Sequence, residues 1–413
     1  MGLSGKPNCW RELLRITFLL TQSLESPSGL GRYWPLSKEL ARLGHDVTIL
    51  ALHHDLASLK QRFTIIDGVR VHYVGQMHVL KKGNTKFYFG TPRLLWITAL
   101  ATWNLMKAAI QIPTDVYHIC KPHPMNGIAA VVAHSLRGKP IYLDCDDYEA
   151  VSNRFGGEWQ RYPVAFFEDK LPTMAKGITV NTRFTFERLR KLGYPIGRIV
   201  YVPNGVDRER FSNADKMAVS VLRQQYGLDE RKIILYIGSL SLTSHAVDLL
   251  IEAFKIVQKL IPQAVLLLIG GGEDYNALYE QVKDMGLDNN VCFIGRVPPS
   301  QVPIYYFLAD VSVDPVYNDM VAMARSPLKI VESLACGVPV VTGNVGDRAE
   351  LLAHGGGVLV PPGDPDALAK ALALLLTDKV LQARLSREAL MAREKYWWDT
   401  LVHDFVQVYG DNN

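Results

Sequence analysis

The sequence predicts an α/β protein made of two doubly wound units in tandem, each with a parallel sheet. Along both halves of the chain, short β-rich apolar runs alternate with helical segments, which is the pattern of βαβ units. The 413 residues are enough for about two or three domains. Because 48% of them are apolar and 21% charged, the units can bury real cores. Such sheets bind ligands beyond the carboxyl ends of their strands, so two facing units predict a site in the cleft between them.

The first half begins with an apolar run of strand length at residues 15–22. A turn containing Gly29 and Gly31 follows, and residues 35–44 then have helical spacing. Further strands are expected at 45–52, 115–120, 140–147, 177–182 and 198–203, separated by helical segments. This order predicts a mainly parallel sheet for a first domain at residues 1–205.

The second half repeats the scheme from residue 206 to about residue 385. Strands are expected at 232–240, 264–273, 291–297, 311–316 and 338–343. Helices are expected at 246–260, 275–287, 301–310, 327–336 and 364–376. The glycines at 270–272 lack the G-x-G-x-x-G spacing of a dinucleotide site, so they predict a tight turn.

Charge and cysteine use indicate two units with different partners in a reducing compartment. Up to Gly205 there are 26 Lys and Arg against 15 Asp and Glu, whereas the remainder has 19 against 26. The five cysteines are scattered without a CxxC pair, which argues against a disulfide framework or a structural zinc site. Residues 1–23 make a poor signal peptide, and no apolar run reaches the roughly 18 residues of a membrane span. We therefore expect a cytoplasmic protein.

The segment at 324–341 predicts a helix entered through Ser326 and Pro327. Proline suits the first helical position, where its missing N–H is no loss. The amides of Leu328 and Lys329 would then point into the cleft, so this helix start is a candidate anion site. Arg325 and Lys329 add positive charge beside it.

Glu332 lies about one and a half turns into this helix. Its pattern alone leaves two interpretations open. It is either a solvated helix charge or a carboxylate that accepts hydrogen bonds from two vicinal hydroxyls, as on a ribose.

Candidate residues also follow strands of the first half. His118 and His123 suit an active site, although a core or loop histidine fits each equally well. The acids at 144–149 allow either a metal site or a group that orients a sugar, and no histidine cluster supports the metal. Asp146 or Asp147 is the preferred orienting residue.

Five stretches resemble glycosyltransferase family 4, whose members are retaining GT-B enzymes that use nucleotide-activated sugars. These stretches are residues 29–50, 202–211, 291–315, 329–352 and 355–376. The resemblance spans residues 14–410 and implies a GT-B fold with two Rossmann-like domains facing across a cleft. It also implies a C-terminal helix at 386–413 that returns toward the first domain.

The resemblance assigns roles to these candidates. Glu332 would bind the nucleotide ribose, and the helix start before it would bind the donor phosphates. The expected donor-binding residues are Gly29, Gly31, Gly238, Ser239, Arg296, Val297, Arg325, Ser326, Leu328 and Glu332. The expected catalytic residues are His118, Asp146 and Lys329. Neither a cofactor nor a metal is expected.

Two departures from the family pattern concern the donor site. The acid that family members carry eight residues before the ribose acid is replaced by Ala324. The loop after the strand at 232–240 lacks the usual Arg and Lys, and has Ser239, Ser244 and His245 instead. Arg325 and Lys329 can replace the missing phosphate cations.

We therefore expect a metal-independent retaining glycosyltransferase acting on a UDP- or GDP-type donor. The acceptor would be a glycan, a lipid-linked molecule or a small molecule, and nucleic acid is not an expected partner. The alternatives are a GT-B protein that binds sugar or nucleotide but has lost catalysis, and a nucleotide-sugar epimerase of related fold.

Residues 68–114 contain no Asp or Glu, which suggests contact with an anionic membrane. The cations of this segment are Arg70, Lys81, Lys82, Lys86, Arg93 and Lys107, and its aromatic residues include Trp96 and Trp103. Cations beside aromatics suit weak peripheral attachment to the inner face of a membrane. The alternative is that the aromatics are core and the cations belong to an ordinary solvated loop.

Overall fold

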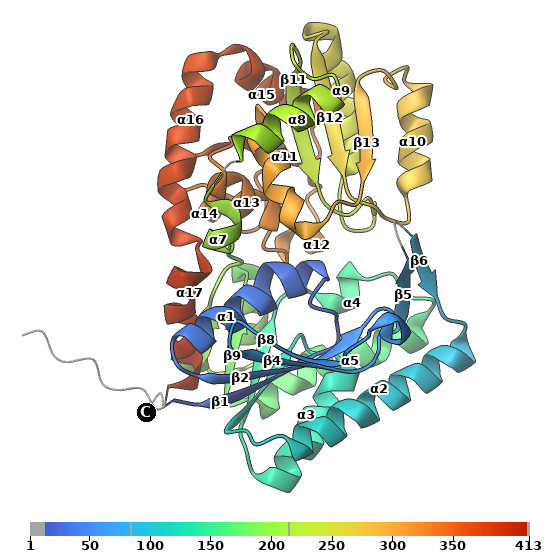
Figure 1. The fold of residues 1–413 in the computed structure, drawn as a ribbon, viewed down its shortest axis with the longest axis vertical. Helices are drawn as coiled ribbons and strands as arrows, with labels where there is room; N and C mark the ends of the chain where they lie inside the picture. Colours follow the sequence, from blue (N-terminus) through green and yellow to red (C-terminus); the bar gives the residue numbers. More distant parts are fainter. Residues whose placement is uncertain (1–12, 83–84, 214, 411–413) are drawn as a thin grey trace, which may run out of the picture.

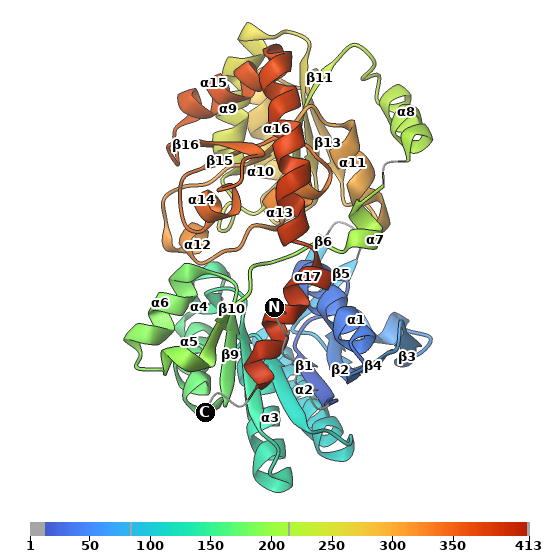
Figure 2. The ribbon, with the colours of Figure 1, turned by 90° about the vertical axis from the view of Figure 1, so that its left-hand side faces the viewer.

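The computed structural model describes residues 13–82, 85–213 and 215–410, without the side chains of residues 81–86. The chain forms two α/β units placed end to end (Figure 1). They are joined near residue 205 and again by the C-terminal helices, which run along one side of both units (Figure 2).

The first unit contains an eight-stranded sheet in the order β10-β9-β8-β7-β1-β2-β4-β3. Its strands are β1 (Arg15–Leu20), β2 (Asp46–His53), β3 (Phe63–Ile66), β4 (Val69–Gln76), β7 (Val116–Cys120), β8 (Ile141–Cys145), β9 (Gly177–Val180) and β10 (Ile199–Tyr201). All neighbouring strands are parallel except β3 and β4. Strands β7 and β8 are buried along their whole length, because helices cover both faces of the sheet.

One face of this sheet packs against α2, α3, α5 and α6, and the opposite face packs against α1 and α17. The helices are α1 (Trp34–Arg42), α2 (Thr91–Gln111), α3 (Pro124–Arg137), the short α4 (Glu149–Ser152), α5 (Glu158–Met174), α6 (Arg183–Lys191) and α17 (Trp398–Phe405). The Thr182 side chain caps α6 by accepting the Thr185 N–H. A hairpin of β5 (Val79–Lys82) and β6 (Thr85–Tyr88) extends toward the second unit (Figure 1).

The second unit contains a fully parallel sheet in the order β13-β12-β11-β14-β15-β16. Its strands are β11 (Lys232–Ile237), β12 (Ala264–Ile269), β13 (Val291–Gly295), β14 (Val311–Asp314), β15 (Val340–Gly343) and β16 (Gly357–Val360). Its helices are α7 (Arg208–Phe211), α8 (Lys216–Gln225), α9 (Val247–Leu260), α10 (Tyr275–Asp284), α11 (Val302–Leu308), α12 (Met320–Met323), α13 (Leu328–Ala335), α14 (Arg348–Leu351), α15 (Pro365–Thr377) and α16 (Lys379–Ala392). Helices α9, α10 and α15 cover one face, while α11 and α13 cover the other.

The C-terminal segment crosses from the second unit to the first after α16. Leu385 and Ala389 of α16 belong to the cores of the second unit, whereas Phe405 of α17 belongs to a core of the first. A β-bridge between Val206 and Trp397 lies at the crossing. Residue 386 therefore lies inside α16, and we place the start of the returning segment at residue 393. The division at 205/206 remains our proposal.

The strand orders confirm the predicted doubly wound α/β architecture. Chain order reverses between β7 and β1 in the first sheet and between β11 and β14 in the second. Ligands of such sheets bind at these switch points, outside the carboxyl ends of the strands. The loops that follow β1, β7, β11 and β14 are therefore where a site is expected.

Candidate active site

The two units meet where the turn after β1 lies against the first turn of α13. A Cβ on Gly31 would lie 2.3 Å from Leu328 Cδ1, so the backbone approaches this side chain more closely than an alanine would allow. Trp398 Nε1 donates to the Gly31 carbonyl at 2.9 Å. The backbone N–H of Asn204 donates to Ser326 Oγ at 3.1 Å, and its side-chain amide donates to the Ser326 carbonyl at 2.9 Å. Gly31, Ser326 and Leu328 are thus brought together.

Helix α13 begins one residue later than predicted. Pro327 is its N-cap, in an extended conformation with φ −75° and ψ 108°, and no side chain among the described residues caps the helix. The N–H of Ile330 donates to the Pro327 carbonyl at 3.1 Å. The first N–H groups of a helix have no partner inside the helix, so this uncapped start is suited to the oxygens of an anion.

Three fixed cations and a histidine lie around this helix start, and we call Arg325, Lys329, Arg348 and His245 the cation cluster. Arg325 Nη1 and Lys329 Nζ lie 3.2 and 3.4 Å from His245 Nδ1. Buried Asp314 at the end of β14 pairs with Lys329 at 3.4 Å and with Arg348 at 2.8 Å. Lys329 and Arg348 thus share one carboxylate, and Arg325 lies beside them, which leaves positive charge for an anionic ligand.

Lys329 is buried, and its stem lies against the backbone that follows β11. A Cβ on Gly238 would lie 2.8 Å from Lys329 Cε, and the ammonium lies 5.3 Å from the centre of the Tyr236 ring. Tyr236 donates to the Ser239 carbonyl at 2.8 Å. Burial lowers the pKa of Lys329, with Arg325 and Arg348 adding to the effect and Asp314 opposing it. Gly238 and Ser239 therefore adjoin the cation cluster, as a donor-binding role requires.

Glu332 lies half-buried on α13 and accepts a hydrogen bond from the Tyr306 hydroxyl at 3.0 Å. Burial raises the pKa of Glu332, while Arg210, Tyr306 and Lys329 oppose that rise. A fully solvated helix charge would have no such surroundings. The carboxylate is therefore placed where it can meet a ligand, one turn beyond the cation cluster.

Arg296 and Val297 follow β13 at the same edge of the second sheet, and both are half-buried. Burial lowers the pKa of Arg296.

The glycine run at residues 270–272, which follows β12, forms a tight turn, since a Cβ on Gly270 would lie 1.8 Å from the Gly238 carbonyl oxygen. Gly270 has φ +136°, which is a glycine conformation.

Lys121, which the sequence analysis did not identify, forms ion pairs with the acids that follow β8. Its ammonium lies 3.3 Å from Asp146, 2.8 Å from Asp147 and 2.7 Å from Glu149. Lys121 has φ +67°, an unusual conformation for a residue other than glycine and one that often marks functional sites. Its position directly after a strand and before a helix was the available signal.

The contacts of the acids at 144–149 show which of them could still meet a ligand. Asn181 Nδ2 donates to Asp146 at 2.6 Å, and burial raises the pKa of Asp146 to about 6. Asp147, whose side chain is 27% exposed, is better placed to meet a sugar. Asp144 is held in a buried pair with Arg32 at 2.6 Å. Because lysine and arginine already occupy these carboxylates, the donor set does not suit a metal ion.

The catalytic role expected for His118 is not supported by its position. The side chain is completely buried, and its Nδ1 lies 2.8 Å from the Tyr409 hydroxyl. The ring also contacts Phe18 and Phe405, so it packs between the sheet and the C-terminal segment. Burial lowers the pKa of His118 to about 4. We therefore reassign His118 to the core, which was the alternative its sequence pattern allowed.

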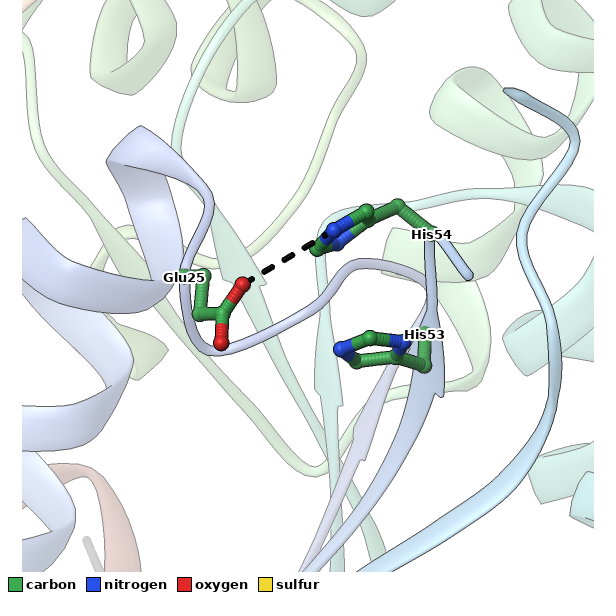
Figure 3. A group of neighbouring side chains, drawn as sticks. All are labelled: Glu25, His53 and His54. Atoms are coloured by element: carbon green, nitrogen blue, oxygen red, sulfur yellow. Dashed lines mark ion pairs between the residues drawn. The ribbon is translucent and has the colours of Figure 1, made fainter. Parts of the chain in front are cut away.

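Glu25, His53 and His54 form a group of possible metal ligands at the carboxyl end of β2 (Figure 3). Their ligand atoms lie within 4.8 Å of one another, as in a metal site. His53 Nδ1, however, accepts a hydrogen bond from the backbone N–H of Asp55 at 3.1 Å. The ring proton is therefore on Nε2, and neither nitrogen of the ring has a free lone pair for a metal. Only His54 and the exposed Glu25 could then bind a metal, which is fewer than the three or four protein ligands of a zinc site.

Comparison with known proteins places the chain in a family. Residues 28–205 match the model of the glycosyl transferase 4-like domain, and residues 220–390 match glycosyl transferases group 1. The crystal structure of Anabaena Alr3699/HepE in complex with UDP and glucose superposes with a TM-score of 0.73 at 20% identity, covering 96% of this chain and all of that one. The fold is therefore GT-B.

Curated relatives agree with the family models. A GDP-mannose-dependent alpha-(1-6)-phosphatidylinositol monomannoside mannosyltransferase of Mycobacterium tuberculosis is 31% identical over 266 residues, which are 62% of this chain and 67% of that protein. Its Mycolicibacterium smegmatis counterpart is 30% identical over 53% of this chain, and the match spans only 58% of that relative. The chain belongs to the glycosyl transferases group 1 family.

Proposed function

We propose that the protein transfers a sugar from a nucleotide-sugar donor to an acceptor hydroxyl, with retention at the anomeric carbon and without a metal ion. The observation that carries this proposal is the cation cluster at the start of α13, with Glu332 one turn further on. A diphosphate requires positive charge and N–H donors, and a ribose requires a carboxylate that accepts hydrogen bonds. The N–H donors, Lys329 and Glu332 belong to α13, and Arg325 lies just before this helix.

The chemistry follows from the charge that develops when the donor breaks apart. The departing diphosphate gains negative charge, and preorganised donors at that position lower the barrier to reaction. Arg325, Lys329 and the N–H groups of α13 supply this stabilisation in the proposal, in place of a metal. The acceptor hydroxyl would lose its proton to the departing phosphate on the same face of the sugar, which gives retention.

The names of the relatives suggest the first donors and acceptors to test. The two mycobacterial relatives are named for GDP-mannose and phosphatidylinositol monomannoside. We propose a GDP- or UDP-type donor, with GDP-mannose as the first candidate, and an acceptor that is a glycan or is linked to a lipid. Asp147, at the edge of the first sheet, would orient a hydroxyl of the sugar or of the acceptor.

A thermal-shift screen of the intact protein tests the binding part of this proposal. GDP, UDP, GDP-mannose and UDP-glucose are compared with the corresponding nucleosides and with inorganic phosphate. We expect at least one nucleoside diphosphate to raise the melting temperature more than its nucleoside does, because a ligand that binds only the folded state stabilises it. No shift with any nucleotide would contradict the proposal.

A protein that binds nucleotide sugars without turning them over is the second candidate function. Ala324, which is buried, occupies the position where family members carry the acid that handles the donor sugar. If the donor sugar needs that carboxylate, binding would survive and transfer would not. Turnover with a supplied acceptor separates the two functions.

We also propose weak peripheral contact with an anionic membrane through α2. Ala101, Leu105 and Ala109 are the buried residues of this helix. Trp96 and Trp103 project from the opposite side and are 69% and 59% exposed. The side chains of Lys81, Lys82 and Lys86 lie outside the described residues.

Further observations support a lipid surface as the partner of this face. Leu95, Leu100, Arg93 and Lys107 are also exposed on α2, and the helix lies on the side of the first unit away from the second (Figure 1). Exposed tryptophans beside cations suit a headgroup region better than water. Among the described residues, no helix has the length and apolar character needed to cross a bilayer.

Vesicle sedimentation tests the membrane proposal. We expect the protein to sediment with vesicles containing anionic lipid at low salt, and to be released at high salt because each surface cation contributes only about 1 kcal/mol. Replacing Trp96 and Trp103 together by serine should abolish sedimentation. Leu260→Ser, at an exposed position of the second unit, is the matched control and should not change it. Equal sedimentation of all three proteins would show that α2 is not the contact.

A further inference from the structure

His245 lies in the loop between β11 and α9, among the cations expected to hold the donor phosphates. Its Nδ1 is approached by Arg325 Nη1 at 3.2 Å and by Lys329 Nζ at 3.4 Å. Arg325 also donates to the Ser244 carbonyl, which holds the loop against the segment before α13. The His245 and Tyr236 rings form a T-shaped pair, with an interplanar angle of 75° and the ring centres 6.4 Å apart.

This geometry determines the protonation state of the ring. Guanidinium and ammonium groups only donate hydrogen bonds, so the atom that both approach must offer a lone pair. His245 is therefore neutral in this structure, with its proton on Nε2. Burial lowers the pKa of His245 well below its usual range, and Lys329, Arg325 and Arg348 lower it further.

The charged and titratable groups around the ring come from every neighbouring element. Lys329 belongs to α13, Arg325 to the segment before it, Arg348 to α14 and Tyr236 to β11. Asp314 of β14 balances part of this charge through Lys329 and Arg348. A diphosphate that binds here would neutralise the positive charge that Asp314 leaves unbalanced, because it carries two or more negative charges.

We infer that His245 is a direct ligand of the donor diphosphate and takes up one proton at Nδ1 when that diphosphate binds. The inference deepens the proposed function and rests on it. Phosphate oxygens are better acceptors for Arg325 and Lys329 than an imidazole nitrogen. Once these two donors turn to the phosphate, the Nδ1 lone pair is released and binds a proton from solvent. The imidazolium then donates a hydrogen bond to the anion, and no other bond is made or broken.

Linkage sets the direction of the resulting pH dependence. Proton uptake on binding means that the pKa of His245 is higher in the complex than in the free protein. Affinity for the donor therefore rises as pH falls through the pKa of the complex, by up to tenfold per pH unit for one proton. Affinity stops rising below the pKa that His245 has in the free protein, because His245 is then protonated in both the free protein and the complex.

Calorimetry of the intact protein with GDP-mannose and UDP-glucose between pH 5.5 and 8.5 tests the inference. Both phosphates of a nucleotide sugar are esterified, so the ligand lacks the phosphate ionisation near pH 6 that would confuse the measurement. Repeating each titration in two buffers of different ionisation enthalpy gives the number of protons exchanged. We expect uptake approaching one proton and an affinity that falls at least fivefold from pH 6 to pH 8.

Two variants separate His245 from other groups that titrate. His245→Gln should lose the proton uptake and the pH dependence of affinity. His245→Lys should bind as tightly at pH 8 as the natural protein does at pH 6, because its charge is fixed. His403→Gln, at an exposed position of α17, is the matched control and should behave like the natural protein.

Two results would overturn the inference and leave the proposed function standing. One is that His245→Gln still takes up a proton on binding, and the other is that the natural protein binds a nucleotide sugar without taking up a proton. Failure to bind either nucleotide sugar at any pH overturns the proposed function and the inference with it.

Discussion

Replacing Arg325 and Lys329 together by methionine is expected to weaken binding of a nucleoside diphosphate by about 10²–10⁴-fold. Each hydrogen bond to a charged group contributes about 1.5–3 kcal/mol, and about 1.4 kcal/mol corresponds to a factor of ten. The loss should be confined to the diphosphate, so affinity for the corresponding nucleoside should change by less than about threefold. Asp314 keeps Arg348 as a partner, and the fold should therefore survive.

Titration calorimetry with GDP or UDP and with the matching nucleoside measures this difference directly. The control variant replaces Lys255 and Lys259, two exposed lysines of α9, by methionine. It changes the net charge by the same amount but lies outside the cation cluster. Equal losses for nucleoside and diphosphate would show that the phosphates bind elsewhere.

Glu332→Ala is expected to weaken binding of nucleoside and nucleoside diphosphate alike, by about 1.5–3 kcal/mol. The reason is that the carboxylate would accept hydrogen bonds from the ribose, which both ligands carry. Glu332→Gln keeps an acceptor oxygen but loses the charge, so its loss should be smaller. The stability of the fold should change little, because Glu332 is only half-buried.

The same calorimetric titrations separate this role from a general effect of charge. Glu280→Ala, at an exposed position of α10, removes one acid from the same unit and should leave affinity unchanged. If Glu332→Ala binds nucleotide as tightly as the natural protein, Glu332 is a solvated helix charge and the ribose lies elsewhere. Together the two experiments divide the donor site into a phosphate half and a ribose half.

Most of the sheet architecture could be predicted because buried parallel strands are short continuous apolar runs. The expected strands at 15–22, 115–120 and 264–273 correspond to β1, β7 and β12. The structure also contains β3 to β6 and β16, which were not predicted. Polar and apolar residues alternate along β4, and β3 and β16 have only four residues each, so none of these three strands is a long continuous apolar run.

The site was partly predictable for a different reason. Gly31 lies in the turn after β1, and Lys329 and Glu332 lie in the first two turns of α13, so local sequence spacing was enough to identify them as candidates. Lys121 and Asp314 act through partners far away in the sequence, and pattern alone cannot identify such contacts. His118 shows the reverse error, because it is the middle residue of β7 and its ring packs in the core against Phe405 of the returning α17.

Turnover tests the central claim most directly. The intact protein is incubated with GDP-mannose or UDP-glucose, with and without a phosphatidylinositol mannoside acceptor, and both products are measured. The proposed function predicts release of one nucleoside diphosphate for each glycosylated acceptor formed, with the anomeric configuration of the donor retained by NMR. Tight binding of a nucleotide sugar without turnover, across a panel of donors and lipid-linked, glycan and small-molecule acceptors, would contradict it and identify a binding protein instead.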